Sequence, residues 1–168
     1  MGAKLPLIPR RADAWVVALD PGKRCPGVAL FRSGRLVDAT ALPNDGDIDT
    51  AAVAVIEWIA GRCDYLVVER PQVYPGRRAS DYGITCLKDM LAIVSAFKRP
   101  YIELYPSDWK GAVPKEITTA RLHRRLVPGR CSEVLWHDIG TRAGSALDAY
   151  DAIGIGAFAL GWVSRGCV

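Results

Sequence analysis

Two short apolar segments that each end in an acidic residue constrain the fold of this chain more than any other feature. Residues 14–20 (AWVVALD) and 64–69 (DYLVVE) are continuous runs of largely aliphatic residues, each shorter than a typical helix. Such runs are typical of strands that are buried on both faces of a sheet. We therefore predict two interior strands that carry Asp20 and Glu69 at their ends.

The remaining segments complete the order of elements. Apolar periodicity and turn residues predict strands at residues 14–20, 27–32, 35–42, 64–69 and 101–105, and helices at residues 48–60, 81–97, 115–126 and 145–163. The first three strands follow one another directly, whereas the later strands are joined through helices, which predicts antiparallel and then parallel pairing with right-handed crossovers. We therefore expect an α/β fold with a mixed five-stranded sheet and helices on both faces. Loops are expected at residues 70–80 and 106–114, and around Trp136 and His137.

Length and composition fit one globular domain, which we place at residues 14–168 behind an N-terminal extension of residues 1–13. The net charge of +4 does not by itself indicate a polyanionic partner, although basic residues concentrate in residues 70–130. The 5 cysteines form no CxxC pair, which argues against a disulfide framework or a zinc site and predicts a reducing, cytoplasmic environment. No segment has the length and apolarity that would predict a membrane span or a signal peptide.

A further pair of acids lies in the last predicted helix. Asp148 and Asp151 are three residues apart and share a helix face that is otherwise rich in Ala, Gly and Ile, which indicates burial. Buried carboxylates require a neutralising partner, and a divalent cation such as Mg²⁺ or Mn²⁺ prefers such oxygen ligands. Each acid also has a simpler interpretation, since Asp20 precedes a Pro-Gly turn and Glu69 ends a strand. The four acids together indicate a metal site more strongly than any one of them.

Four segments form a pattern of higher specificity: ALDPGKRCPGVALF, DYLVVERPQVY, YPSDWKGAVPKEITTARL and ALDAYDAIGIGAFAL. In this order, from about Trp15 to Leu160, they resemble the successive motifs of the RuvC-type Holliday-junction resolvases, which belong to the RNase H-like nuclease superfamily. The resemblance implies an RNase H-like fold and a site of catalytic, metal-binding acids at Asp20, Glu69, Asp148 and Asp151. It also implies two metal ions per active site and hydrolysis of DNA that leaves 5′-phosphates.

The implied substrate is branched DNA, a four-way junction that needs two symmetric cuts. Two-fold symmetry of the substrate favours a homodimer, and the predicted helix at residues 81–97 is the candidate interface. That helix has the apolar pattern of an ordinary core helix as well.

Basic and aromatic residues in the middle of the chain are candidates for DNA contacts. The candidates are Arg70, Tyr74, Arg77, Arg78, Lys110, Lys115, Arg121, Arg124 and Arg125. Lys110 and Lys115 lie in the segment that resembles the phosphate-contacting region of the family; the alternative is a pair of exposed loop lysines. Tyr74 follows Glu69 closely and is the candidate for stacking at the junction centre, or else it packs on the sheet edge. The three arginines on the helix at residues 115–126 could form a basic stripe.

Two other functions stay open. Another RNase H-like nuclease, such as a YqgF-like enzyme that processes ribosomal RNA precursors, has a first motif that also resembles DPGKRCPGVAL. The double acid in the last helix and the PSDWK segment favour the resolvase. The second alternative, a non-catalytic nucleic-acid-binding module, is disfavoured because all four acids are present.

Overall fold

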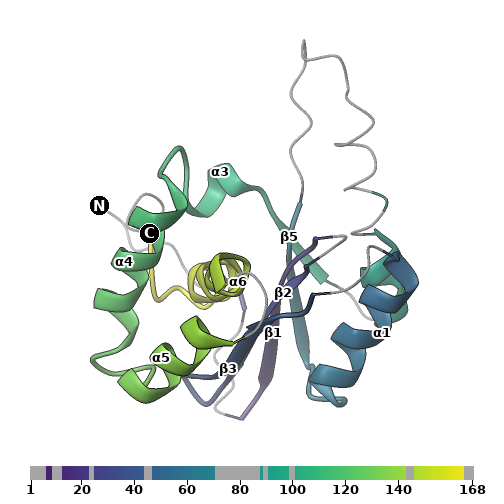
Figure 1. Ribbon diagram of the computed structural model, residues 1–168, viewed down its shortest axis with the longest axis horizontal. Helices are drawn as coiled ribbons and strands as arrows, with labels where there is room; N and C mark the ends of the chain where they lie inside the picture. Colours follow the sequence, from purple (N-terminus) through teal and green to yellow (C-terminus); the bar gives the residue numbers. More distant parts are fainter. Residues whose placement is uncertain are drawn as a thin grey trace.

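A five-stranded sheet forms the centre of the molecule, with helices on both of its faces (Figure 1). The computed structural model describes residues 7–8, 13–22, 25–43, 47–70, 88, 91–98, 101–142 and 146–164. The strands are β1 (Trp15–Asp20), β2 (Gly27–Arg32), β3 (Arg35–Ala41), β4 (Tyr65–Glu69) and β5 (Tyr101–Leu104). The helices, labelled as in Figure 1, are α1 (Ile48–Ile59), α3 (Pro106–Trp109), α4 (Lys115–Leu126), α5 (Glu133–Thr141) and α6 (Ala146–Ala159).

The strand order is β3-β2-β1-β4-β5. β1, β2 and β3 pair in antiparallel fashion, whereas β4 is parallel to both β1 and β5. The hairpin turn between β2 and β3 has positive φ at Ser33 (51°) and Gly34 (74°), the conformation that matches the twist of two paired strands. The predicted mixed α/β sheet is therefore confirmed.

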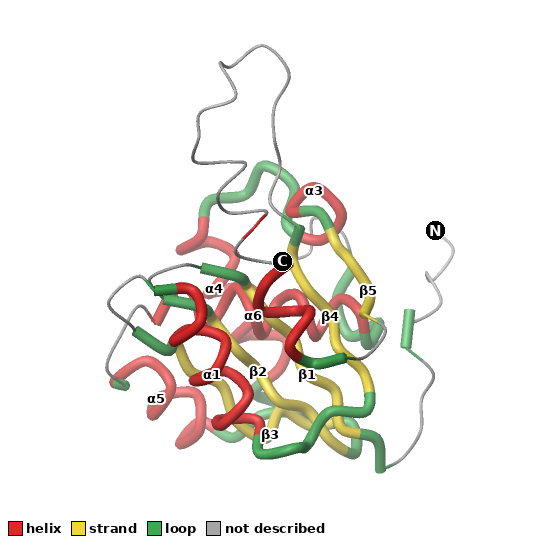
Figure 2. The backbone as a smooth tube through the Cα atoms, turned by 90° about the vertical axis from the view of Figure 1, so that its right-hand side faces the viewer, coloured by secondary structure: helices red, strands yellow, loops and turns green. Residues whose placement is uncertain are grey.

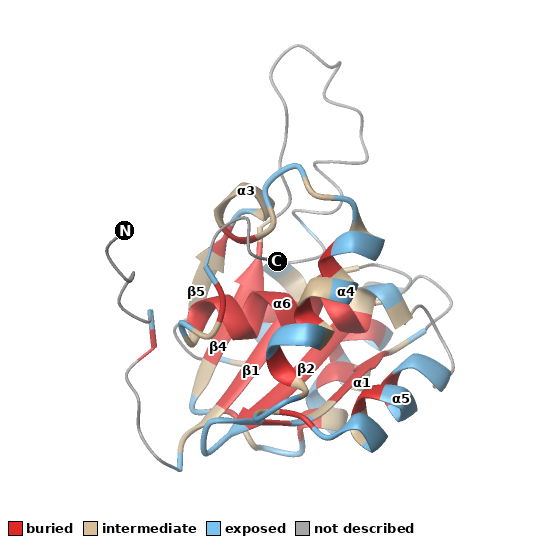
Figure 3. Ribbon diagram, turned by 90° about the vertical axis from the view of Figure 1, so that its left-hand side faces the viewer, coloured by how far each residue is buried: buried red, intermediate tan, exposed pale blue. Residues whose placement is uncertain are grey.

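The two faces of the sheet pack against different helices because side chains alternate along each strand. In β1, Val17 and Leu19 contribute to a core cluster with α1, whereas Val16 and Ala18 contribute to a cluster with α4, α5 and α6. Figure 1 shows the sheet between these two layers, and Figure 2 looks onto the sheet from the side of α1. From Ala149 onward every residue of α6 is buried (Figure 3), so this helix is the centre of the second layer.

The loop predicted around Trp136 and His137 is wrong, because this segment forms α5. The Ser132 side chain caps the helix by accepting a hydrogen bond of 3.1 Å from a backbone N–H. Trp136 stacks on Tyr150 of α6, with the ring centroids 4.7 Å apart. Only Trp136 and Ile139 of α5 are buried, and so short an apolar stripe is a weak sequence signal.

Two boundaries also differ from the prediction. The segment predicted as a loop at residues 106–114 contains the short helix α3. The last helix ends at Ala159, earlier than predicted, because Gly161 adopts a positive φ of 69° and the Trp162 N–H donates to the Ala157 carbonyl at 2.8 Å. This arrangement closes the helix end in the manner of a glycine-terminated helix.

Several predicted segments fall largely outside the described residues. Of the helix predicted at residues 81–97, the described part includes Ile93 and Val94, which are buried against α1 and the sheet. The boundary at residue 13 stays a prediction, and Ile8, within the predicted extension, is fully buried in the cluster of α6. Among the described residues, no helix combines the length and apolarity needed to cross a bilayer.

Candidate active site

The ends of β1 and β4 bring two acids together. These strands are parallel neighbours, and Leu19 pairs with Val68, so the next residues, Asp20 and Glu69, lie side by side. Because side chains alternate, Asp20 points to the same face as Ala18, the face covered by α6. The strand register therefore directs both carboxylates toward the helix that carries the other two acids.

A glycine in β2 sets the position of Asp148. Gly27 pairs with Asp20 across the antiparallel ladder, and a Cβ atom at Gly27 would lie 2.0 Å from the backbone carbonyl oxygen of Asp148. The first turn of α6 therefore packs directly on the β2 backbone beside Asp20. Asp151 follows one turn later and is only 2 % exposed.

Replacement of Gly27 by Ala is expected to lower the free energy of unfolding by about 1–3 kcal/mol, because the added methyl group must push the first turn of α6 off the sheet. Chemical denaturation measures this change. The matched control is Gly129→Ala, since a Cβ atom at Gly129 meets nothing within 4 Å. Equal stability of the two variants would contradict this packing of α6.

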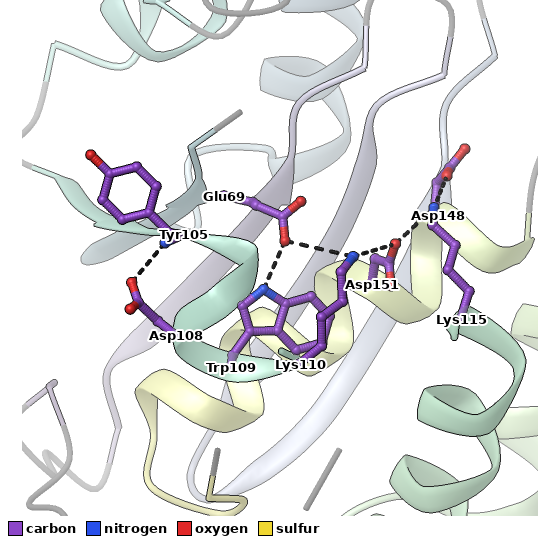
Figure 4. Close-up of polar contacts among 8 residues, drawn as sticks. All are labelled: Glu69, Tyr105, Asp108, Trp109, Lys110, Lys115, Asp148 and Asp151. Carbon is purple, nitrogen blue, oxygen red and sulfur yellow. Dashed lines mark hydrogen bonds and ion pairs between the residues drawn. The ribbon is translucent and has the colours of Figure 1, made fainter. Parts of the chain in front are cut away.

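Two lysines form ion pairs with the acids (Figure 4). Lys110 Nζ lies 3.3 Å from Asp151 Oδ2 and 3.8 Å from Glu69 Oε2. Lys115 Nζ, at the start of α4, lies 2.7 Å from Asp151 Oδ2 and 3.1 Å from Asp148 Oδ1. These pairs connect β4, α6 and the segment from α3 to α4 in one charged cluster.

Trp109 belongs to the same cluster, although the sequence did not identify it as a functional residue. Its Nε1–H donates to Glu69 Oε2 at 2.7 Å, and the side chain is fully buried. The short helix α3 holds it in place, because the Asp108 carboxylate accepts a hydrogen bond of 2.8 Å from the Tyr105 N–H at the helix start. Tyr105 and Asp108 both belong to the YPSDWK segment, which was the sequence signal for this helix.

Burial and mutual repulsion oppose ionisation of the strand-end acids. The pKa of Asp20 is raised well above its ordinary value of 3.8 by burial and by the nearby Glu69 and Asp151. Burial also raises the pKa of Glu69, and Asp151 adds to the effect, although Lys110 and Trp109 act against it. Burial opposes the charge of Lys115 as well, but its hydrogen bonds and attraction to Asp151 and the charge of Asp20 raise the pKa of its ammonium.

The donor set suits divalent cations. All four acids supply carboxylate oxygens, the ligands that Mg²⁺ and Mn²⁺ prefer, from two strands and a buried helix. Within the described part of the chain, no three His, Cys, Asp or Glu side chains are gathered as ligands of one ion; the Lys110 ammonium contacts both Glu69 and Asp151 instead. With all groups ionised, the four acids exceed the two lysines in charge, which leaves net negative charge for a cation.

Four of the remaining candidates for DNA contacts lie among the described residues. Arg70 pairs with Glu103 of β5 at 2.7 Å and lies over the Tyr105 ring, 5.6 Å from its centroid. Arg124 and Arg125 are exposed near the end of α4, and Arg121 is partly buried one turn earlier. The other three candidates, Tyr74, Arg77 and Arg78, lie outside the described residues.

Solved structures provide the comparison for this fold, since no family model and no curated protein sequence matches the chain. The yeast mitochondrial Holliday junction resolvase Ydc2 matches with a TM-score of 0.58 and 12% identity, over 92% of this chain and 80% of that one. The fowlpox virus resolvase in complex with Holliday junction DNA matches with a TM-score of 0.56 and 12% identity, over 88% and 99%.

A third match is the RuvC protein of Thermus thermophilus in complex with a Holliday junction substrate. It has a TM-score of 0.51 and 15% identity, over 85% of this chain and 90% of that one. The element order, the mixed sheet and these matches agree with the fold implied by the sequence motifs. The chain therefore has the RNase H-like fold of the RuvC-type Holliday-junction resolvases.

Proposed function

We propose that the chain is a metal-dependent, structure-selective DNA endonuclease that resolves four-way junctions by paired phosphodiester hydrolysis, leaving 5′-phosphates. The observation that carries the proposal is the cluster of Asp20, Glu69, Asp148 and Asp151, which three separate elements bring together around two lysines. The similarity of the fold to RuvC and to the fowlpox virus resolvase, both solved in complex with Holliday junctions, supports the choice of substrate.

The acids have different roles in this proposal. Asp20, Glu69 and Asp151 would hold two Mg²⁺ or Mn²⁺ ions, and Asp148, the more exposed of the α6 pair, would complete the ligand set. Such ions activate a water nucleophile and stabilise the leaving 3′ oxygen. The protein contributes rigid placement, because the ligands come from strand ends and from a helix that is buried along most of its length.

The two lysines would serve the phosphate. In the ion pairs described above, their ammonium groups neutralise carboxylates that would otherwise repel one another. With the carboxylates neutralised by bound cations, Lys110 and Lys115 would be free to turn toward phosphate oxygens of the scissile strand. The same two lysines would thus pair with the acids before metal binds and contact phosphate afterwards, as the sequence predicts.

Two symmetric cuts require two active sites, and we propose a homodimer. Arg70, Arg121, Arg124 and Arg125, with Tyr74, Arg77 and Arg78, are the proposed contacts to the junction arms and centre. Size-exclusion chromatography with light scattering measures the oligomeric state, and a strict monomer at micromolar concentration would contradict the dimer.

Cleavage of a synthetic four-way junction with Mg²⁺ tests the proposal, with Y-shaped and linear duplex DNA of the same sequences for comparison. The wild-type chain is expected to cut the junction in symmetric pairs, and Asp148→Asn is expected to lose this activity because it removes a ligand charge. The matched control is Asp138→Asn, which makes the same change at an exposed position on α5 and should leave cleavage unchanged.

Three results would contradict the proposal. Cutting by Asp148→Asn at the wild-type rate would refute the assigned site. Cleavage of structured RNA in preference to every DNA substrate would instead identify a ribosomal RNA-processing type of nuclease. Binding of junctions without any metal-dependent turnover would identify a non-catalytic module.

A further inference from the structure

The indole of Trp109 contacts a proposed metal ligand from a fully buried position. Its Nε1–H donates to Glu69 Oε2 at 2.7 Å, and the side chain is 0 % exposed. Hydrogen bonds to a carboxylate are short and strong, and a buried donor is costly to leave without a partner. From these contacts we infer that Trp109 is a positioning residue that fixes the Glu69 carboxylate for metal binding. The inference rests on the proposed function.

The hydrogen bond assigns separate tasks to the two oxygens of Glu69. Oε2 accepts from Trp109 and is also the oxygen nearest to Lys110, at 3.8 Å. A glutamate side chain has three rotatable bonds, so one anchored oxygen removes most of its freedom to turn. Oε1 is then left as the oxygen that a cation would use. Groups that orient a metal ligand in this way commonly determine metal affinity.

Trp109 can perform this task because its own ring is held on two sides. A Cβ atom at Gly154 would lie 2.3 Å from the ring carbon Cζ3, so the α6 backbone packs directly against the indole. The Lys110 ammonium lies over the ring, 4.8 Å from its centroid. The indole therefore cannot swing away from Glu69 without displacing α6 or breaking the lysine contacts.

The experiment measures Mn²⁺ binding to the full-length chain by electron paramagnetic resonance, independently of cleavage. Trp109→Phe keeps an aromatic ring but removes the N–H donor, and we expect Mn²⁺ affinity to fall by about tenfold or more, as is typical when an outer-shell partner is lost. The matched control is Trp136→Phe, because Trp136 is buried in the same core cluster and stacks on Tyr150. This control should bind Mn²⁺ with wild-type affinity.

A second variant separates the hydrogen bond from packing. Site-specific replacement of Trp109 by β-(3-benzothienyl)alanine preserves the shape of the ring and exchanges the N–H for sulfur. If the N–H positions Glu69, this isostere should weaken Mn²⁺ binding to the same extent as Trp109→Phe. Wild-type affinity in the isostere would overturn the inference, and the isostere alone decides the matter if Trp109→Phe does not fold by circular dichroism.

Failure of the inference and failure of the proposed function give different results. A wild-type chain that binds no Mn²⁺ and cuts no junction refutes the proposed function, and this inference with it. If the wild-type chain binds Mn²⁺ and cuts the junction, and the isostere variant binds Mn²⁺ equally well, only the role of Trp109 is refuted.

Discussion

Replacement of Asp20 by Asn is expected to reduce junction cleavage on the order of 10³-fold or more, while the fold becomes no less stable. The loss follows because Asp20, which lies near Glu69 and Asp151, would hold the metal ions together with them. The retained stability follows because ionised Asp20 is disfavoured by burial and by Glu69 and Asp151. Initial rates on a four-way junction and chemical denaturation of the same preparation measure both effects.

The dependence of stability on pH provides an independent check of this prediction. The pKa of Asp20 is raised in the folded state, so its contribution to stability is fully present below its ordinary value of 3.8. That contribution is lost as the pH rises from there through the raised folded value, because the unfolded chain gives up the proton more readily. In metal-free buffer, the free energy of unfolding of Asp20→Asn should therefore fall less steeply with pH than that of the wild type. Parallel curves for the two proteins would argue against a crowded, partly buried Asp20.

Replacement of Lys110 by Met is expected to lower the free energy of unfolding, measured without metal, by about 3 kcal/mol. This value is near the lower end of the usual cost of breaking a buried ion pair, because Lys110 retains some contact with solvent. The change leaves Asp151, whose side chain is only 3% exposed, and Glu69 with one fewer cation. Addition of Mg²⁺ should recover most of the deficit, because the metal then supplies the missing charge and need not displace the ammonium.

Denaturation curves recorded with and without Mg²⁺ measure this recovery. Lys88→Met is the matched control, since Lys88 is exposed and should show neither the deficit nor the recovery. If Mg²⁺ stabilises Lys110→Met no more than it stabilises the wild type, the Lys110 ammonium does not occupy the place that a bound metal ion would take.

Local sequence patterns were sufficient to predict the strand-end acids. Asp20 and Glu69 end apolar runs that are too short for helices, and parallel pairing of such runs places their ends at one edge. Asp148 and Asp151 were identifiable because helical spacing puts them on one face. These features depend on periodicities of two to four residues, which a single sequence displays directly.

The contacts between distant segments could not be predicted in the same way. The bond from Trp109 to Glu69 depends on the direction of α3, and on the absence of a side chain at Gly154 of α6. The pairing of Lys110 with Asp151 joins residues that lie far apart in the chain, and only the packed arrangement shows that the lysine points inward. α5 was missed because two buried residues give too little periodicity.

The buried course of α6 has a consequence for the evolution of such a protein. Substitutions along this helix would affect folding and chemistry together, because the segment that carries two of the proposed ligands is also a central support of the hydrophobic core. Exposed positions of α4, such as Arg124 and Arg125, carry no such double constraint. Divergence in substrate preference among relatives of this fold is therefore expected to accumulate on the outer helix surface, while the inner helix changes slowly.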